Sequence, residues 1–177
     1  DTGEQSTLPF AFQEADLSSA GGILAFTGPD ALVAADTNEE SDVYVYERSS
    51  GTLTLISADR SGKSGAGSSG SPSVSDDGRY VLFDTEAPNF VASDTDLWSD
   101  VFLHDRQTGE TRLVSTGSSG DDSLAGSLAG DASTAVFVSF DDGLVPGDSN
   151  GKGDLFVWRR DRAGLERASL TAEGGES

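Results

Sequence analysis

One pattern of residues occurs three times along this chain of 177 residues, at intervals of about 55 positions. The clearest copy, residues 71–83, predicts a short strand, a tight turn at Asp77-Gly78 and a buried strand. Residues 17–26 and 128–137 align with this copy. The alignment places three aromatic residues in register: Phe26, Phe83 and Phe137. A repeat at a fixed interval indicates that the chain stacks copies of one supersecondary unit.

A second module follows each copy and contains two more expected strands. The first of these is a β-rich run with large apolar side chains, too short for a helix. The three runs are residues 42–46, 100–104 and 154–158. A glycine then supplies the positive φ of a turn, and the three glycines are Gly51, Gly109 and Gly164. The last strands of the repeats are expected at residues 53–57, 111–115 and 165–169.

The chain is therefore expected to be an all-β protein. Four antiparallel strands joined in series describe one blade of a β-propeller, so we expect three four-stranded antiparallel blades. Their approximate bounds are residues 12–57, 71–115 and 125–170, within a single module of residues 1–177. Twelve strands could also form a β-sandwich. A sandwich does not predict equivalent residues at a fixed interval, so the propeller is favoured.

The middle repeat resembles a known family. Residues 71–83 and the later run 100–109 are similar to the repeat of TolB-type β-propellers. The resemblance extends over about residues 12–170 and is weaker in the outer repeats, where Ala132 replaces the turn residue Gly78. It implies a propeller that serves as a platform for protein interactions.

Three blades are too few to close a ring, because propellers contain about four to eight. The two end blades would each expose an apolar face, which proteins generally avoid. We therefore expect half of a six-bladed ring, completed by a second copy of the chain in a two-fold symmetric homodimer. Two alternatives remain open at this point. The chain could be an excerpt of a longer propeller, or its copies could join head to tail as a polymer.

The charge of the chain limits its partners. Asp and Glu number 31 against 11 Lys and Arg, for a formal net charge of −20. Nucleic acid is excluded because its phosphates would be repelled. No run approaches the length of about 18 apolar residues that a membrane helix needs, so no membrane insertion is expected. The acidity favours hard cations, although salt-adapted proteins show the same composition.

Each expected third strand is preceded by an acidic loop with the pattern Asp-x-Asp/Asn-x-x-x-Asp. The candidate metal ligands are Asp36, Asn38 and Asp42; Asp94, Asp96 and Asp100; and Asp148, Asn150 and Asp154. Such loops offer the carboxylate, amide and carbonyl oxygens that Ca²⁺ takes in sets of about 6–8. The second loop has three carboxylates and no cation and is the strongest candidate, whereas Lys152 weakens the third. Without the distant glutamate of an EF-hand, binding in the millimolar range is expected.

No catalytic residue is predicted. The single histidine, His104, aligns with Tyr46 and Trp158, which is typical of a strand side chain. No serine has an assignable acid–base partner. The expected function is a non-catalytic, calcium-binding propeller module for protein interaction or extracellular assembly, located in the periplasm, at the cell surface or outside the cell. The alternatives are a propeller domain associated with a peptidase or polysaccharide-active enzyme, and a structural subunit of an extracellular filament.

Overall fold

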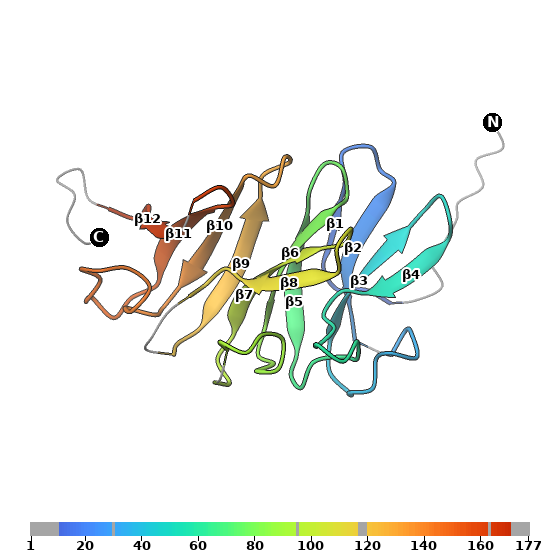
Figure 1. The fold of residues 1–177 in the computed structure, drawn as a ribbon, viewed down its shortest axis with the longest axis horizontal. Helices are drawn as coiled ribbons and strands as arrows, with labels where there is room; N and C mark the ends of the chain where they lie inside the picture. The colour runs from blue at the N-terminus through green and yellow to red at the C-terminus, as the bar shows by residue number, and fades with distance from the viewer. Residues whose placement is uncertain (1–10, 30, 95, 117–119, 163, 171–177) are drawn as a thin grey trace.

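The computed structural model describes residues 11–29, 31–94, 96–116, 120–162 and 164–170 (Figure 1). These residues form three antiparallel sheets of four strands, and none of them lies in a helix. It follows that no described segment is a helix capable of crossing a membrane. The predicted module of residues 1–177 extends beyond the described residues at both ends.

The strands of each sheet follow one another in sequence order. The first sheet contains β1 (Ala15–Leu17), β2 (Ile23–Gly28), β3 (Asp42–Glu47) and β4 (Thr52–Leu55). The second contains β5 (Ser69–Val74), β6 (Tyr80–Thr85), β7 (Asp100–Asp105) and β8 (Glu110–Leu113). The third contains β9 (Ser123–Leu128), β10 (Thr134–Ser139), β11 (Asp154–Arg159) and β12 (Leu165–Arg167).

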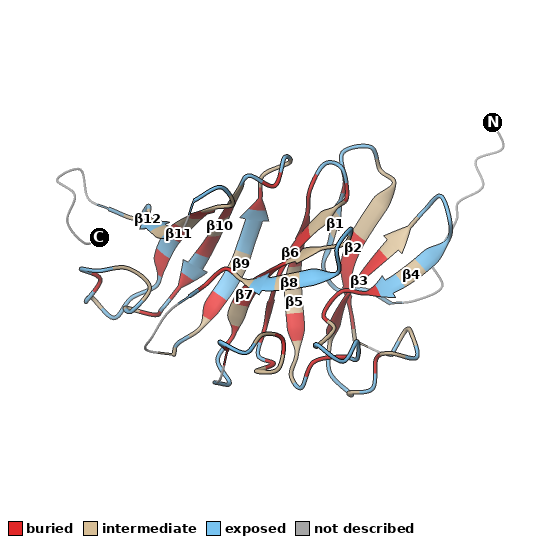
Figure 2. Ribbon diagram, viewed as in Figure 1, coloured by how far each residue is buried: buried red, intermediate tan, exposed pale blue. Residues whose placement is uncertain are grey.

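The three sheets are arranged as propeller blades. The first strands of neighbouring sheets lie beside one another, since β5 contacts β1 and β9 contacts β5 (Figure 1). Buried segments concentrate where adjacent sheets face each other, and the outer strand β8 is largely exposed (Figure 2). The prediction of an all-β protein with three four-stranded blades, half of a six-bladed ring, is confirmed.

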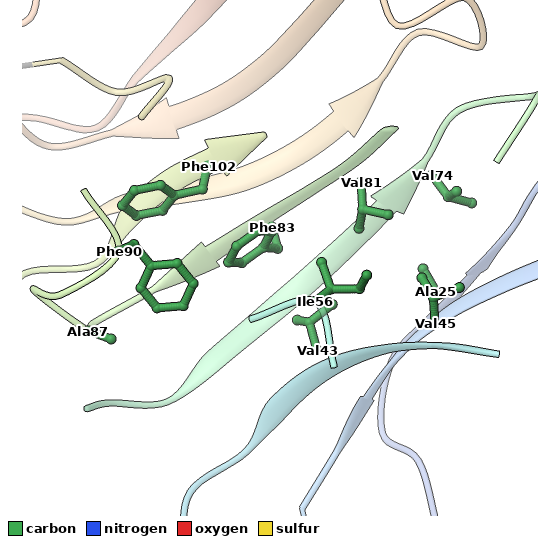
Figure 3. Close-up of a cluster of buried hydrophobic side chains, with 10 residues drawn as sticks. All are labelled: Ala25, Val43, Val45, Ile56, Val74, Val81, Phe83, Ala87, Phe90 and Phe102. Atoms are coloured by element: carbon green, nitrogen blue, oxygen red, sulfur yellow. The ribbon is translucent and has the colours of Figure 1, made fainter. Parts of the chain in front are cut away.

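Apolar side chains at equivalent positions fill the spaces between blades. Each blade carries a pair of stacked aromatic rings from its second and third strands. The pairs are Phe26 and Tyr44 at 5.6 Å, Phe83 and Phe102 at 5.9 Å, and Phe137 and Phe156 at 5.7 Å. The Phe83 pair belongs to the core between blades 1 and 2 (Figure 3). The Phe137 pair belongs to the core between blades 2 and 3. The register of the repeat therefore sets which face of each blade is buried.

Two strands begin earlier than the sequence indicated. β5 begins at Ser69 and β9 at Ser123, each two residues before the expected start of its blade. Both early ends pair with the next strand through hydroxyl groups, because Ser69 Oγ lies 2.9 Å from Thr85 Oγ1 and Ser123 Oγ lies 2.8 Å from Ser139 Oγ. A register shift follows in each strand pair. Serine and glycine are not typical strand residues, so the sequence does not indicate these early strand ends.

The turn between the first two strands of a blade requires a left-handed residue. Gly21 and Gly78 occupy this position with φ of 68° and 72°. Ala132, the equivalent residue of blade 3, has φ of 54°. The repeat thus imposes the turn geometry even where glycine is absent, and the departure noted in the sequence leaves the turn itself unchanged.

The Gly78→Ala variant should lower the free energy of unfolding by about 2 kcal/mol or more, because a left-handed φ costs a residue with a Cβ about 1–2 kcal/mol. An added Cβ would also lie 2.3 Å from Ile23 Cγ1 of blade 1. The matched control is Gly51→Ala, where φ is 69° and no atom lies within 4 Å of the added Cβ. Urea denaturation should show the larger loss for Gly78→Ala, and equal losses would argue against close packing of this turn on blade 1.

Candidate metal centre

The three acidic loops end at the same point of each blade. Their last aspartates, Asp42, Asp100 and Asp154, are the first residues of β3, β7 and β11. A serine that follows the fourth strand donates a hydrogen bond from its hydroxyl to each of these carboxylates; the three serines are Ser57, Ser115 and Ser169. The same hydroxyl accepts a hydrogen bond from the next backbone N–H of β3, β7 or β11 at 2.9–3.0 Å. One oxygen of each terminal carboxylate is thereby fixed in the fold.

The second loop brings three carboxylates together. Oxygens of Asp94, Asp96 and Asp100 all lie within 4.8 Å of one another. Asp94 is buried, with 7% of the residue exposed, and its Oδ1 has no hydrogen-bond partner among the described residues. A buried carboxylate oxygen without a partner is costly unless a cation compensates it. The set is oxygen-only, which suits a hard divalent ion.

The electrostatics of the second loop are unfavourable in the absence of a cation. Burial raises the pKa of Asp100 to about 7, and the charges of Asp94, Asp96 and Asp141 act in the same direction. Burial, followed by the charge of Asp96, also raises the pKa of Asp94. None of the ion pairs among the described residues involves Asp94, Asp96 or Asp100. These carboxylates therefore repel one another, and a bound cation would remove that repulsion.

The first loop has a similar arrangement in which two of the predicted ligands are carboxylates. Asp36 and Asp42 are both buried, and each has one oxygen without a hydrogen-bond partner. The Tyr44 hydroxyl donates to the other oxygen of Asp36. Burial raises the pKa of Asp42 to about 6, and the charge of Asp36 adds to the increase. Asn38 is held by its Nδ2, which donates to the Gly65 carbonyl at 2.9 Å.

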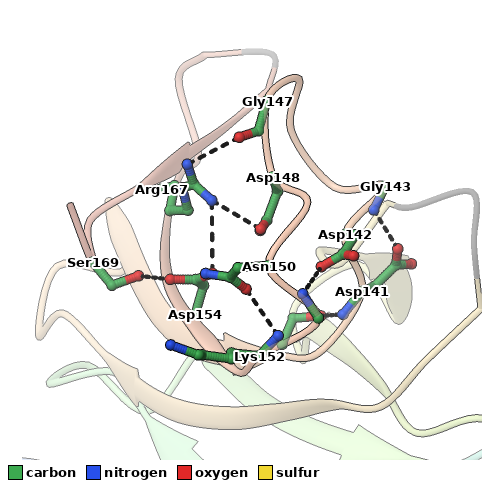
Figure 4. Close-up of polar contacts among 12 residues, drawn as sticks. Asp141, Asp142, Gly143, Gly147, Asp148, Asn150, Lys152, Asp154, Arg167 and Ser169 are labelled. Carbon is green, nitrogen blue, oxygen red and sulfur yellow. Dashed lines mark hydrogen bonds and ion pairs between the residues drawn. The ribbon is translucent and has the colours of Figure 1, made fainter. Parts of the chain in front are cut away.

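The third loop contains its own cation. Arg167 Nη1 lies 2.8 Å from Asp148 Oδ1 and 3.7 Å from Asp154 Oδ2 (Figure 4). Asn150 Nδ2 donates to Asp154 Oδ2 at 3.3 Å. All three predicted residues of this loop are brought together, but around a guanidinium group. The positive charge that a metal would supply is thus already present in this loop.

Sequence reasoning missed Arg167, although a signal was present. Arg167 pairs with Phe156 across β11 and β12, as Leu55 pairs with Tyr44 and Leu113 with Phe102 in the other blades. The arginine therefore replaces a leucine of the repeat. A cation at an apolar position of the repeat, beside an acidic loop, indicates an internal ion pair. Blades 1 and 2 have leucine at this position, so their acidic loops have no such cation from the fourth strand.

His104 is placed as expected for a strand side chain. It pairs with Val81 as Tyr46 pairs with Leu24 and Trp158 with Ala135. Its Nδ1 lies 2.8 Å from the Thr111 hydroxyl, and burial lowers its pKa.

In the presence of a chelator, we expect the free energy of unfolding to decrease as the pH rises from about 4 to about 7. The carboxyl of Asp100 has a pKa of about 7 in the folded chain against an ordinary value of 3.8, so the folded state binds more protons across this range. The stabilisation that comes from protonated Asp100 is complete below pH 3.8 and is lost as the pH rises through about 7. Urea denaturation of wild type and Asp100→Asn at several pH values isolates this contribution. Identical pH profiles of the two proteins would contradict it.

Comparisons with known proteins agree on the fold. No protein-family model matches the chain, and no curated protein matches it in sequence. Among solved structures, TolB from Acinetobacter baumannii has a TM-score of 0.59 at 18% identity, over 97% of this chain and 39% of TolB. Porphyromonas gingivalis dipeptidyl peptidase 4 has a TM-score of 0.55 at 17% identity, over 94% of this chain and 27% of that chain.

A third structure is itself a propeller domain. The β-propeller domain of the Trilobed protease from Pyrococcus furiosus, described as having an open velcro topology, has a TM-score of 0.51 at 13% identity. The match covers 89% of this chain and 43% of that domain. The chain thus spans less than half the length of each of these three structures. At these identities the similarity establishes the fold alone, and that fold is a TolB-like β-propeller.

Proposed function

We propose that the chain is a non-catalytic, calcium-binding β-propeller module that functions in protein interaction or extracellular assembly. The observation that carries the metal proposal is the unpartnered, buried Oδ1 of Asp94 beside the carboxylates of Asp96 and Asp100. The third loop supports it by contrast, because Arg167 provides there the charge that loops 1 and 2 lack. The cation would link the loop to the first residue of β7 and stabilise the folded blade.

Calcium fits this loop better than magnesium. Ca²⁺ accepts several protein oxygens in a flexible geometry, whereas Mg²⁺ keeps most of its waters and binds few carboxylates. Loops with two or three carboxylates and no distant bidentate glutamate should bind calcium in the millimolar range, as extracellular modules do. We therefore place the protein in the periplasm, at the cell surface or outside the cell, where calcium reaches such concentrations.

Calcium should raise the melting temperature, and chelation should lower it. Binding to the folded state alone adds about 2.7 kcal/mol per site when free calcium exceeds the dissociation constant 100-fold. Asp94→Asn combined with Asp96→Asn should remove the contribution of loop 2 and leave that of loop 1. Asp161→Asn makes the same type of charge change in the turn after β11, and should leave the calcium effect intact. A melting curve that calcium does not change would refute the proposal.

The two end blades offer surfaces for assembly. Leu155 of blade 3 is 40% exposed, whereas its equivalents Val43 and Val101 are fully buried against the next blade. Leu17 of blade 1 is 55% exposed, whereas its equivalents Val74 and Leu128 are 6% exposed against the preceding blade. The exposed face of blade 3 and the exposed face of blade 1 therefore correspond to the two surfaces that meet wherever neighbouring blades pack together. Two copies of the chain could therefore close a six-bladed ring, with blade 3 of each against blade 1 of the other.

Sedimentation tests this assembly directly. The wild type should sediment as a dimer at tens of micromolar, and Leu155→Glu should sediment as an 18.3 kDa monomer with unchanged circular dichroism. A wild-type monomer would contradict the closed ring. Filaments seen by electron microscopy would instead favour head-to-tail contacts, since heterologous interfaces that do not close produce fibres.

A second candidate function is a propeller domain that accompanies an enzyme. The similarity to dipeptidyl peptidase 4 and to the propeller domain of the Trilobed protease favours it. A nucleophile-bearing domain encoded in the same reading frame would support this candidate. Hydrolysis of peptide or polysaccharide substrates by the purified chain itself would overturn the non-catalytic proposal.

A further inference from the structure

A cavity of about 840 Å³ lies beside the outer strand of blade 2 and extends to blade 3. Its lining includes Tyr80 and Leu103 of blade 2, whose side chains belong to the core facing blade 3. Three arginines line the same cavity: Arg60 between β4 and β5, Arg112 of β8, and Arg160 directly after β11. The cavity therefore combines an apolar wall with three arginines, of which Arg112 and Arg160 come from the neighbouring blades 2 and 3.

Arg112 and Arg160 each rest on an aromatic ring, and the exposed Asp131, whose charge acts on Arg160, is hydrogen-bonded to Ser133 in its own turn. The Arg112 guanidinium lies 4.6 Å from the ring centre of Trp158, and that of Arg160 lies 4.5 Å from the ring centre of Tyr80. Among the described residues, neither takes part in an ion pair, and Arg160 Nη1 is buried without a hydrogen-bond partner. Arg48, Arg60 and Arg162 also form no ion pair among the described residues, but only Arg160 of these arginines has a buried guanidinium nitrogen without a hydrogen-bond partner.

The equivalent arginine of blade 2 is fully engaged. Arg106 donates from Nη1 to the Gly78 carbonyl at 2.6 Å, and its Nη2 lies 3.7 Å from Glu47 of blade 1. Asp105 has the register position of Glu47 and could have paired with Arg160. Asp105 is instead bound by Arg79, whose Nε and Nη2 donate hydrogen bonds to its two carboxylate oxygens at 2.8 and 2.6 Å. The cleft between blades 2 and 3 thus lacks the acidic partner that its counterpart provides.

The same cleft contains an additional cation. Arg112 pairs with Leu103 across the sheet, at the position where blade 1 has Thr54 opposite Val45. Burial, followed by the charge of Arg160, lowers the pKa of Arg112, so the two guanidinium groups are close enough to repel each other. An anionic group between them would relieve that repulsion and could satisfy Arg160 Nη1.

The remaining acidic residues of the cavity do not fill this role. Asp59 accepts hydrogen bonds from the backbone N–H groups of Ser61 and Lys63 in its own turn. Asp105 is bound by Arg79. Glu110, the first residue of β8, is exposed and forms no ion pair among the described residues.

We propose that this cavity binds a ligand that carries a carboxylate next to an apolar group. The carboxylate would bind between Arg112 and Arg160, and the apolar group would pack on Leu103 and the other apolar side chains of the lining, which include Phe90 and Val91. A free organic acid and the C-terminus of a peptide share this chemistry. The site involves neither the acidic loops nor the exposed faces of the end blades, so it is independent of the function proposed above.

Isothermal titration with N-acetyl-leucine tests the proposal, and N-acetyl-leucinamide is the uncharged control. We expect binding of the acid and at least tenfold weaker binding of the amide. N-acetyl-Ala-Ala-Leu with a free C-terminus distinguishes the two sources, because tighter binding of this peptide indicates a peptide terminus and equal or weaker binding indicates a free acid. No binding of either acid, or equal binding of acid and amide, would overturn the proposal. So would inorganic phosphate that binds more tightly than both acids.

Two substitutions locate the site. Arg112→Thr restores the residue of blade 1, and Arg160→Thr removes the second guanidinium group; each should weaken N-acetyl-leucine binding at least tenfold. Arg48→Thr is the matched control, since Arg48 is the exposed equivalent of Arg160 in blade 1 and lies outside the lining of the cavity. Circular dichroism verifies that each variant is folded. Unchanged affinity in both folded cavity variants would contradict the assignment.

Discussion

Phe102→Ala should reduce the free energy of unfolding by about 3–5 kcal/mol, which is among the largest losses expected from a single core residue of this chain. The Phe102 ring is fully buried between blades 1 and 2. The ring of Phe83 lies 5.9 Å from it, and that of Phe90 lies 5.4 Å from it. Truncation would remove buried apolar surface and leave a cavity that the two remaining rings cannot fill without shifting.

Denaturation by guanidinium chloride, followed by circular dichroism, measures this effect. Leu97→Ala is the control, because Leu97 is a large apolar residue that is 77% exposed, and its truncation should cost less than about 0.5 kcal/mol. A loss below about 1 kcal/mol for Phe102→Ala would contradict the description of the space between blades as the main core.

Arg167→Leu should have an effect that depends on calcium. The variant restores the leucine that blades 1 and 2 have at this position, and it leaves Asp148 and Asp154 without their guanidinium partner. Removing one partner of a buried ion pair costs about 3–5 kcal/mol, so the variant should be much less stable than wild type in a chelator. Calcium should restore most of this loss, because loop 3 would then resemble loops 1 and 2.

The control for this prediction is Arg159→Leu. Arg159 forms an exposed ion pair with Glu166 at 3.9 Å, and such pairs contribute less than about 1 kcal/mol. The control should therefore be close to wild type in stability and show the same response to calcium. If Arg167→Leu gained no more stability from calcium than wild type does, loop 3 would not be a metal loop that has acquired an internal cation.

The repeat made the fold predictable from the sequence. Phe26, Phe83 and Phe137 define a register, and that register alone places each strand in its blade and each aromatic ring in its core. The strand ends at Ser69 and Ser123 could not be predicted in this way. They pair through hydroxyl groups beyond a register shift, and a serine-rich composition does not indicate strands.

The candidate metal site was predictable in part. The spacing of aspartates in the second loop indicated that Asp94, Asp96 and Asp100 converge, and the structure brings them together. The third loop is occupied by Arg167, which contacts Asp148 from 19 positions further along the chain. The spacing of residues within the loop cannot reveal that contact. The pair of Arg112 and Arg160 at the cavity could not be predicted from the sequence either. It depends on the hydrogen bonds from Arg79 to Asp105, the acidic residue that could otherwise have paired with Arg160.

Anomalous X-ray scattering from crystals grown with calcium tests the central claim most directly. We predict one peak among the oxygens of Asp94, Asp96 and Asp100, a second beside Asp36 and Asp42, and none where Arg167 meets Asp148. Crystals that diffract well in saturating calcium but show no peak at the Asp94–Asp100 loop would contradict the account.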